Sequence, residues 1–165
     1  MRALLPQPVT SALIFGLWLA LANSLAPGTL IMGGLLALLL PLATRRFWPD
    51  SPHVRRPLAA LRLVARVLGD ILRANLTVAR QVLGPVGRLR PAFFEVPVSI
   101  EDPFVATLLG GIISLTPGTV TIDIVTEGGA VKRLLVHGLD VPDEAAAVAE
   151  IRTRYEQPLK EIFGC

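Results

Sequence analysis

The chain has 165 residues, of which 52% are hydrophobic and 18% are charged, and its mean hydropathy is +0.59. These values are high for a soluble protein and point to contact with a membrane. The single cysteine is the last residue, Cys165, which excludes an internal disulfide and a cysteine-based metal site. We expect an exposed thiol without a role.

Charge is distributed unevenly along the chain. Residues 1–90 hold eleven arginines and two acidic residues, whereas residues 91–165 hold five basic and eleven acidic residues. A basic first half suits the anionic lipid headgroups of a cytoplasmic leaflet. Nucleic acid is not expected as a partner, because the arginines are interleaved with aliphatic rather than aromatic side chains.

Residues 3–44 contain no charged side chain, and this length is about twice one membrane span of roughly 20 residues. The turn-forming cluster in this stretch is 23–29, where the Pro-Gly pair suits a tight reversal. The sequence therefore predicts a transmembrane helical hairpin with spans near 8–24 and 27–44. A cleavable signal peptide is the alternative for the first apolar segment, but a second apolar segment follows at once.

Arginines follow the hairpin closely, and none lies in its turn. The positive-inside rule then places both ends of the hairpin, and the domain that follows, in the cytoplasm. Two aromatic residues lie where the second span should meet the headgroups, and a proline-rich linker completes a first domain of residues 1–57. The arginines are Arg45, Arg46, Arg55 and Arg56, the aromatic residues are Phe47 and Trp48, and the linker runs from Pro49 to Pro57.

Residues 58–83 predict an amphipathic helix, within a second, membrane-associated segment of residues 58–90. At 100° per residue, every charged side chain falls in one stripe less than about 90° wide, and the rest of the surface is aliphatic. We expect this stripe to face membrane headgroups or partner subunits. Its members are Arg62, Arg66, Asp70, Arg73 and Arg80.

Three placements of this helix compete. A lone membrane span would bury several arginines at about 2.5–3.5 kcal/mol each. A helix lying at the interface keeps the arginines among the headgroups, and we favour it over a span packed in a larger bundle. Asp70 is spaced for local ion pairs with Arg66 and Arg73, and the alternative is a carboxylate that relays protons.

Residues 91–165 predict a small cytoplasmic α+β domain of order β-α-β-β-α, with a mostly antiparallel sheet. Pro97 suggests that the first strand is at the edge of the sheet, and Asp102 and Pro103 are suited to begin a helix. Pro158 should kink the last helix or end it early. The expected elements are a strand near 94–100, a helix at 103–113, strands at 120–125 and 131–139 around a loop at 127–129, and a helix at 143–163.

Residues with the spacing of known catalytic or cofactor sites are missing. There is no glycine-rich phosphate loop and no nucleophile elbow, and His53 and His137 have no metal-ligand spacing. We expect His137 to end a strand with a local hydrogen bond. We predict no enzyme activity, catalytic residue, cofactor or metal, and a structural role for the turn Thr116-Pro117-Gly118-Thr119, whose glycine suits a positive φ.

Two segments resemble a known family. Residues 113–123 read Ile-Ser-Leu-Thr-Pro-Gly-Thr-Val-Thr-Ile-Asp, and residues 136–140 read Val-His-Gly-Leu-Asp. Together they are similar to the E subunit of the Mrp-type multisubunit cation/proton antiporters, as are the apolar N-terminal half and the Glu156 and Glu161 pair. The chain departs from the family at Gln157-Pro158, where charged residues are expected.

The resemblance implies a non-catalytic accessory or assembly subunit of a complex in the bacterial inner membrane. Such complexes exchange Na⁺ or K⁺ for protons, driven by the proton-motive force, and ions pass chiefly through the large subunits. Other membrane subunits of the complex and anionic lipid headgroups are then the expected partners. A membrane-tethered adaptor that acts alone is the main alternative, and a membrane enzyme is a third that lacks any catalytic constellation.

Overall fold

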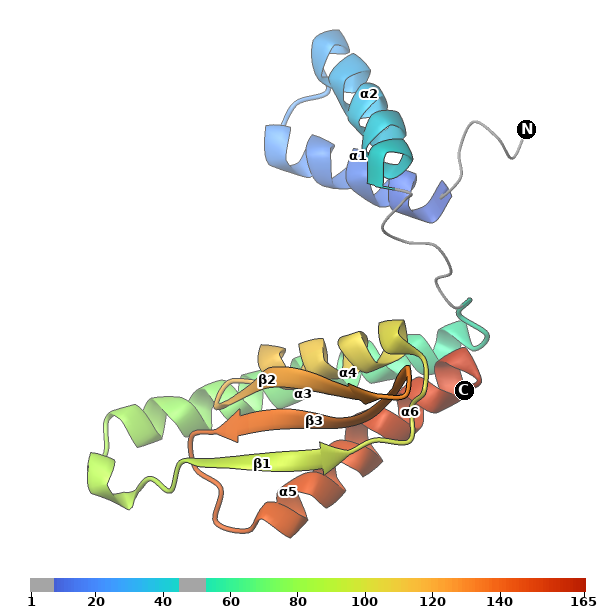
Figure 1. Ribbon diagram of the computed structural model, residues 1–165. Coiled ribbons are helices and arrows are strands. Elements are labelled where there is room, and N and C mark those ends of the chain that lie inside the picture. The colour runs from blue at the N-terminus through green and yellow to red at the C-terminus, as the bar shows by residue number, and fades with distance from the viewer. Residues whose placement is uncertain (1–7, 45–52) are drawn as a thin grey trace. The chain divides into compact units, whose positions relative to one another are not determined.

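The computed structural model describes residues 8–44 and 53–165 (Figure 1). The chain divides into two compact units, Met1–Ser51 and Pro52–Cys165. The sequence predicts three segments, with the amphipathic helix apart from the α+β domain; the structure joins these two because the helix packs into the core of that domain. Arg45, Arg46, Phe47 and Trp48, on which much of the expected orientation rests, lie outside the described residues.

The first unit is a pair of packed helices, α1 (Pro8–Ala22) and α2 (Pro27–Thr44). Asn23, at φ 45°, adopts the left-handed conformation that ends α1, and Ser24 Oγ accepts a hydrogen bond from Ala26 N at 3.2 Å. The expectation that the Pro-Gly pair reverses the chain is therefore wrong, because Pro27 is instead the first residue of α2, where its missing N–H costs nothing.

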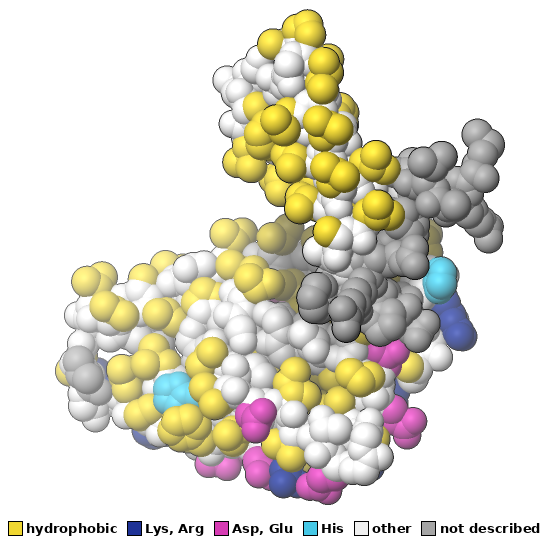
Figure 2. Space-filling view, turned by 45° about the horizontal axis from the view of Figure 1, so that its top comes forward, with side chains coloured by type: hydrophobic (Ala, Val, Ile, Leu, Met, Phe, Trp, Pro, Cys, Tyr) yellow, Lys and Arg dark blue, Asp and Glu magenta, His cyan; other side chains and the backbone are white. Residues whose placement is uncertain are grey.

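Small residues let the two helices approach closely. On α2 the buried residues are Gly33, Ala37 and Pro41, spaced four apart along one side. A Cβ added at Gly33 would lie 2.7 Å from Trp18 Cδ1, and the Trp18 indole donates a hydrogen bond to Thr29 O at 3.0 Å. The leucines point outward, so the hairpin presents a hydrophobic surface (Figure 2). By length and composition α2 could cross a membrane, whereas α1 is a shorter apolar helix.

The second unit contains a three-stranded antiparallel sheet of order β1-β3-β2. The edge position that Pro97 suggests for β1 is confirmed. Gly128 and Gly129 both have positive φ, and they form the tight turn of the β2–β3 hairpin. The strands are β1 (Ala92–Pro97), β2 (Thr119–Glu127) and β3 (Ala130–Gly138).

The helices cover one face of this sheet. α4 (Pro103–Leu115) packs on β2 and β3, and its first turn is capped by Asp102, which accepts from Phe104 N at 2.8 Å as the sequence predicts. α5 (Glu144–Ile151) packs on β1 and continues through a π-helical turn, η3 (Arg152–Glu156), into α6 (Gln157–Phe163). The long helix α3 (Pro57–Val82) packs against α6.

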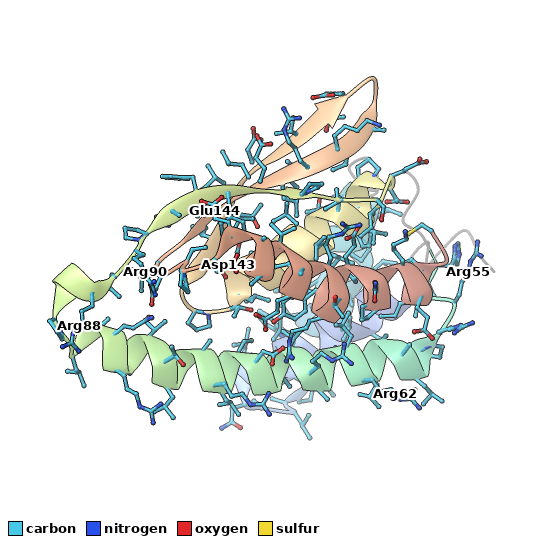
Figure 3. All side chains as sticks on the ribbon, turned by 90° about the horizontal axis from the view of Figure 1, so that it is seen from below. Arg55, Arg62, Arg88, Arg90, Asp143 and Glu144 are labelled. Atoms are coloured by element: carbon cyan, nitrogen blue, oxygen red, sulfur yellow. The ribbon has the colours of Figure 1, made fainter. Side chains whose placement is uncertain are left out.

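Three layers result, as Figure 3 shows: the strands, then the α5–α6 run, then α3. A short 3-10 turn, η2 (Val86–Arg88), leads from α3 to β1. The core between the layers combines side chains from all of them. Its buried members include Leu63, Val67, Phe94, Val96, Leu109, Ile113, Leu134, Val136, Ile151, Tyr155, Leu159 and Ile162.

Pro158 neither ends the last helix nor forces a break in it. A regular α-helix would bring the N–H of residue 158 to the carbonyl of Arg154, and proline has no N–H to give. The chain widens here to the π-turn η3, in which Gln157 N donates to Arg152 O, five residues earlier. The run therefore continues to Phe163 and completes the core.

Candidate membrane and partner interface

Helix α3 has three distinct faces. The inward face is buried against the second unit through Leu63, Val67 and Asp70. At 100° per residue, the middle of an exposed aliphatic face lies about 160° around the helix from it. The aliphatic side chains on that outer face are between 53% and 72% exposed; they are Leu58, Leu61, Val64, Leu68, Leu72 and Leu76.

The predicted arginine stripe lies between these two faces. Arg66 Nη1 donates to Arg154 O at 3.1 Å, and Arg73 Nη1 lies 3.5 Å from Asp70 Oδ1 while its side chain stays 80% exposed. Arg62 and Arg80 are exposed, and neither forms an ion pair within residues 8–44 and 53–165; Figure 3 shows Arg62 pointing away from the domain. The stripe therefore offers positive charge to an outside partner.

Asp70 does not belong to this surface, which corrects its assignment to the membrane or partner interface. It is buried, and its carboxylate accepts hydrogen bonds from the Arg154 guanidinium and, at 3.0 Å, from Tyr155 Oη. The expected local pair with Arg73 exists, but Arg66 bonds elsewhere. Sequence reasoning does not find Arg154 and Tyr155, because spacing holds no signal for partners 84 and 85 residues away.

Hydrogen bonds and burial shift the pKa values of the two partners of Asp70. The hydrogen bond to Asp70 raises the pKa of Arg154. Burial, followed by the hydrogen bond to Asp70, raises the pKa of the Tyr155 phenol. Both groups therefore keep the proton that they donate, and Asp70 joins α3 to η3 through fixed donors.

The turn motif 116–119 joins the end of α4 to the end of β3 and lies close to α3. Thr119 Oγ1 donates to the carbonyl of Ile113 at 2.7 Å, and Leu139 N donates to Gly118 O at 2.8 Å. Gly118 has φ 94°, a conformation that suits glycine, and a Cβ there would lie 3.3 Å from Val78 Cγ2 on α3. The motif acts through its backbone and through the Thr119 hydroxyl.

The second segment that resembles the family, 136–140, also makes contacts that hold the second unit together. Asp140 accepts from Gln81 Nε2 at 3.2 Å and from Arg90 N at 3.3 Å, so it joins the end of α3 to the start of β1. His137 makes no side-chain hydrogen bond within the described residues, contrary to expectation. Its ring instead packs against Phe93, with ring centroids 4.7 Å apart.

The C-terminal helix holds both ends of the second unit. The backbone amides of Arg55 and Arg56 donate to Ile162 O at 2.8 and 3.3 Å, and Arg56 pairs with Glu161.

Glu156 is buried and accepts from Ser99 N and, at 2.9 Å, from Ser99 Oγ. Within residues 8–44 and 53–165, no group of three or more His, Cys, Asp or Glu side chains could hold a metal ion.

A charge-free helical pair joined to a small α+β unit with an exposed amphipathic helix defines a membrane-associated protein. The family model described as "Na+/H+ ion antiporter subunit" matches residues 11–162, and the chain belongs to this family. The predicted resemblance to the E subunit of the Mrp-type antiporters is thereby confirmed.

Relatives and solved structures agree with this assignment. The E subunit of a probable K(+)/H(+) antiporter of Rhizobium meliloti is 30% identical over 99% of both chains, and the E subunit of the Na(+)/H(+) antiporter of Alkalihalophilus pseudofirmus is 26% identical over 94% of this chain and 97% of its own. A chain of an archaeal respiratory membrane complex, the membrane-bound sulfane sulfur reductase, has a TM-score of 0.68 at 29% identity, covering 93% of this chain and 96% of that one. A chain of the Mrp complex from Dietzia has a TM-score of 0.51 at 25% identity, covering 65% and 98%.

Proposed function

We propose that the chain is a non-catalytic accessory subunit of a membrane complex that exchanges Na⁺ or K⁺ for protons. The observation that carries this proposal is the absence of a proton-accepting side chain in the apolar part of the sequence. Residues 3–44 contain no Asp, Glu, His, Lys, Arg, Tyr or Cys. Asp70, the nearest acidic residue that the structure describes, is held by Arg154 and Tyr155. A proton path needs titratable groups, so conduction belongs to other subunits.

The hairpin would anchor the chain with two membrane spans, and α3 would lie along the cytoplasmic surface of the bilayer. In this placement the outer leucines of α3 enter the boundary of the acyl chains, and its arginines meet anionic headgroups at about 1 kcal/mol each. Burial of Leu63 and Val67 in the core supports it. A membrane-spanning α3 would draw the polar α+β domain into hydrocarbon.

The partners that follow are anionic lipid and other membrane subunits. Similarity to chains of an Mrp complex and of an archaeal respiratory complex supports a role inside a larger assembly rather than as a separate adaptor. Arg66 and Arg73 also contact groups of their own domain, whereas Arg62 and Arg80 are left for lipid or for a neighbouring subunit.

Copurification with measured antiport tests the subunit role. An affinity tag on this chain should recover large polytopic subunits from mildly solubilised membranes, and deletion of the chain should lower the amount of assembled complex. Recovery of the chain alone, with cation/proton exchange unchanged by its deletion, would favour the adaptor and reject the subunit role.

Labelling of Cys165 tests the orientation, because its thiol is exposed and is the only one in the chain. A thiol reagent that cannot cross membranes should leave intact cells unlabelled and should label inverted vesicles. Cys165→Ser is the control for background labelling. Rapid reaction from outside the cell would reverse the topology.

A further inference from the structure

The face of the sheet that points away from the helices is uncovered and partly apolar. Phe93 is 65% exposed, Ile122 is 52% exposed and Val120 is 41% exposed. Phe93 and Val120 flank His137 in one cross-strand row, because both residues pair with it in the register of the sheet. Leu135 continues the surface in the next row, between Glu95 and Asp123. We refer to Phe93, Val120, Ile122, Leu135 and His137 as the open patch.

The open patch lies on the side of the second unit opposite to the outer face of α3. The inward side chains of the strands share one core with α5, η3 and α6, and α3 packs beyond them on α6 (Figure 3). If α3 rests on the bilayer, as proposed above, the open patch is directed away from the lipid. In that placement the bilayer cannot cover the open patch.

Acidic side chains lie along one end of the open patch. Glu95, Asp123 and Glu127 lie at its charged end, and the base among them, Arg133, is already within 3.3 Å of Glu95 and 3.2 Å of Glu127. Hydrophobic and acidic side chains lie together on the face of this unit that Figure 2 shows. The residual charge is negative, in keeping with the excess of acidic residues in 91–165.

Addition of another strand at β2 is a poor alternative for this surface. The outer edge of β2 is partly occupied, because Thr121 N donates to Ser114 Oγ at 3.0 Å and Ile124 N donates to Asp123 Oδ1 at 2.8 Å. Two irregularities interrupt the β2–β3 register as well. Bulges and charged side chains of this kind block pairing at an edge. The open patch thus offers its side chains rather than its backbone.

We propose that the open patch binds a basic cytoplasmic loop of another subunit of the complex, through an apolar anchor on Phe93, Val120 and Ile122 and through Lys or Arg side chains that face Glu95, Asp123 and Glu127. Cytoplasmic loops of polytopic membrane proteins are enriched in Lys and Arg, so this charge is complementary to the surface. The inference rests on the proposed subunit role and on the cytoplasmic orientation.

Site-specific photocrosslinking in the intact complex tests it. A photoreactive amino acid at Val120 or Ile122 should form an adduct with a different subunit, and mass spectrometry should map that adduct to a cytoplasmic segment with net positive charge. Thr107, exposed on α4 and away from the sheet face, is the matched control position. An adduct with lipid, an adduct with a second copy of this chain, or a yield no higher than at Thr107 would overturn the inference.

Two substitutions extend the test. Ile122→Ser should reduce the adduct formed from position 120 about tenfold, as expected for the loss of a central apolar anchor. Phe93→Ser should also reduce the adduct, but it removes the ring contact with His137 as well. If Phe93→Ser fails to fold, the result for Ile122→Ser decides whether the apolar anchor is needed for binding. Raising the salt concentration should lower the yield further, because exposed charge pairs are screened.

The two proposals fail in distinguishable ways. If the chain copurifies with the polytopic subunits but the patch gives no specific adduct, the subunit role stands and the loop-binding site is rejected. If the chain does not copurify at all, the subunit role is itself rejected. Normal abundance and an unchanged protease pattern of Ile122→Ser confirm that any lost adduct reflects the surface and not the fold.

Discussion

The Arg66 guanidinium on α3 donates a hydrogen bond at 3.1 Å to the Arg154 carbonyl. In a regular α-helix this carbonyl would accept from the N–H of residue 158, which Pro158 lacks. An arginine of the predicted surface stripe thus completes the hydrogen bonding of a helix 88 residues further along the chain. The π-turn at 152–156 and the position of α3 are consequently linked.

Arg66→Gln should lower the free energy of unfolding of the full chain by about 1 kcal/mol, the usual net value of one hydrogen bond. Thermal unfolding in mild detergent measures it, with Arg62→Gln as the matched control from the same stripe. In a Pro158→Ala background the penalty should shrink, because the introduced alanine supplies an amide to the carbonyl of residue 154. Equal penalties for Arg66→Gln and Arg62→Gln would contradict this role.

Asp70→Asn should destabilise the chain by about 1–3 kcal/mol, because it removes the charge partner of Arg154 in a buried setting. Less complex should then assemble, while the antiport activity of each assembled complex stays unchanged. Glu101→Gln, at an exposed position, is the control. Loss of turnover at normal complex abundance would place Asp70 in a proton path and reject the accessory role.

Tyr155 links stability to alkaline pH. Its pKa is raised above the ordinary value of 10.0, first by burial and then by Asp70, so the folded state favours the neutral phenol. The stabilisation is fully present below about pH 10 and is lost as the pH rises through the raised pKa. Because Tyr155 is the single tyrosine, the phenolate absorbance of the full chain reports it directly. A Tyr155 pKa equal to that of the denatured chain would contradict the buried contact. As the control, Tyr155→Phe should abolish the phenolate absorbance.

Gly118→Ala should lower the free energy of unfolding by about 1–3 kcal/mol, because φ 94° is strained for any residue with a Cβ and the added Cβ would lie 3.3 Å from Val78 Cγ2. The readouts are the amount of assembled complex and the unfolding temperature. Gly111→Ala is the matched control, since α4 leaves open space at that position. If Gly118→Ala accumulates normally but abolishes transport, the turn has a direct part in ion movement and is not structural.

Gly33→Ala should loosen the helical hairpin, since the new methyl would lie 2.7 Å from Trp18 Cδ1 and about 1–3 kcal/mol is typical of overpacking. Trp18 fluorescence in a Trp48→Phe background should report the shifted indole. Gly34→Ala, with nothing within 4 Å, should leave the spectrum and protease resistance unchanged. Identical behaviour of the two variants would mean that the helices do not pack through Gly33.

Local signals in the sequence predict most of the secondary structure. Asp102 and Pro103 begin α4, and Gly128 and Gly129 form the hairpin turn, because capping and positive φ depend on a few neighbouring residues. The reversal at Asn23 escapes such reasoning, since the nearby Pro-Gly pair carries the stronger turn signal. The response to Pro158 escapes it too, because a proline can be accommodated by a π-turn as well as by a break.

The charge-free apolar segment, the β-α-β-β-α order, the amphipathic character of α3 and the family resemblance can all be read from the residues in their linear order. The packed structure was needed to find that Asp70 faces inward, that α3 shares a core with the α+β domain, and that one face of the sheet stays uncovered. The two kinds of feature differ in how far apart along the chain the interacting residues lie. Helix, strand and turn preferences act over a few residues, whereas the bonds from Asp70 to Arg154 and Tyr155 depend on how whole helices pack.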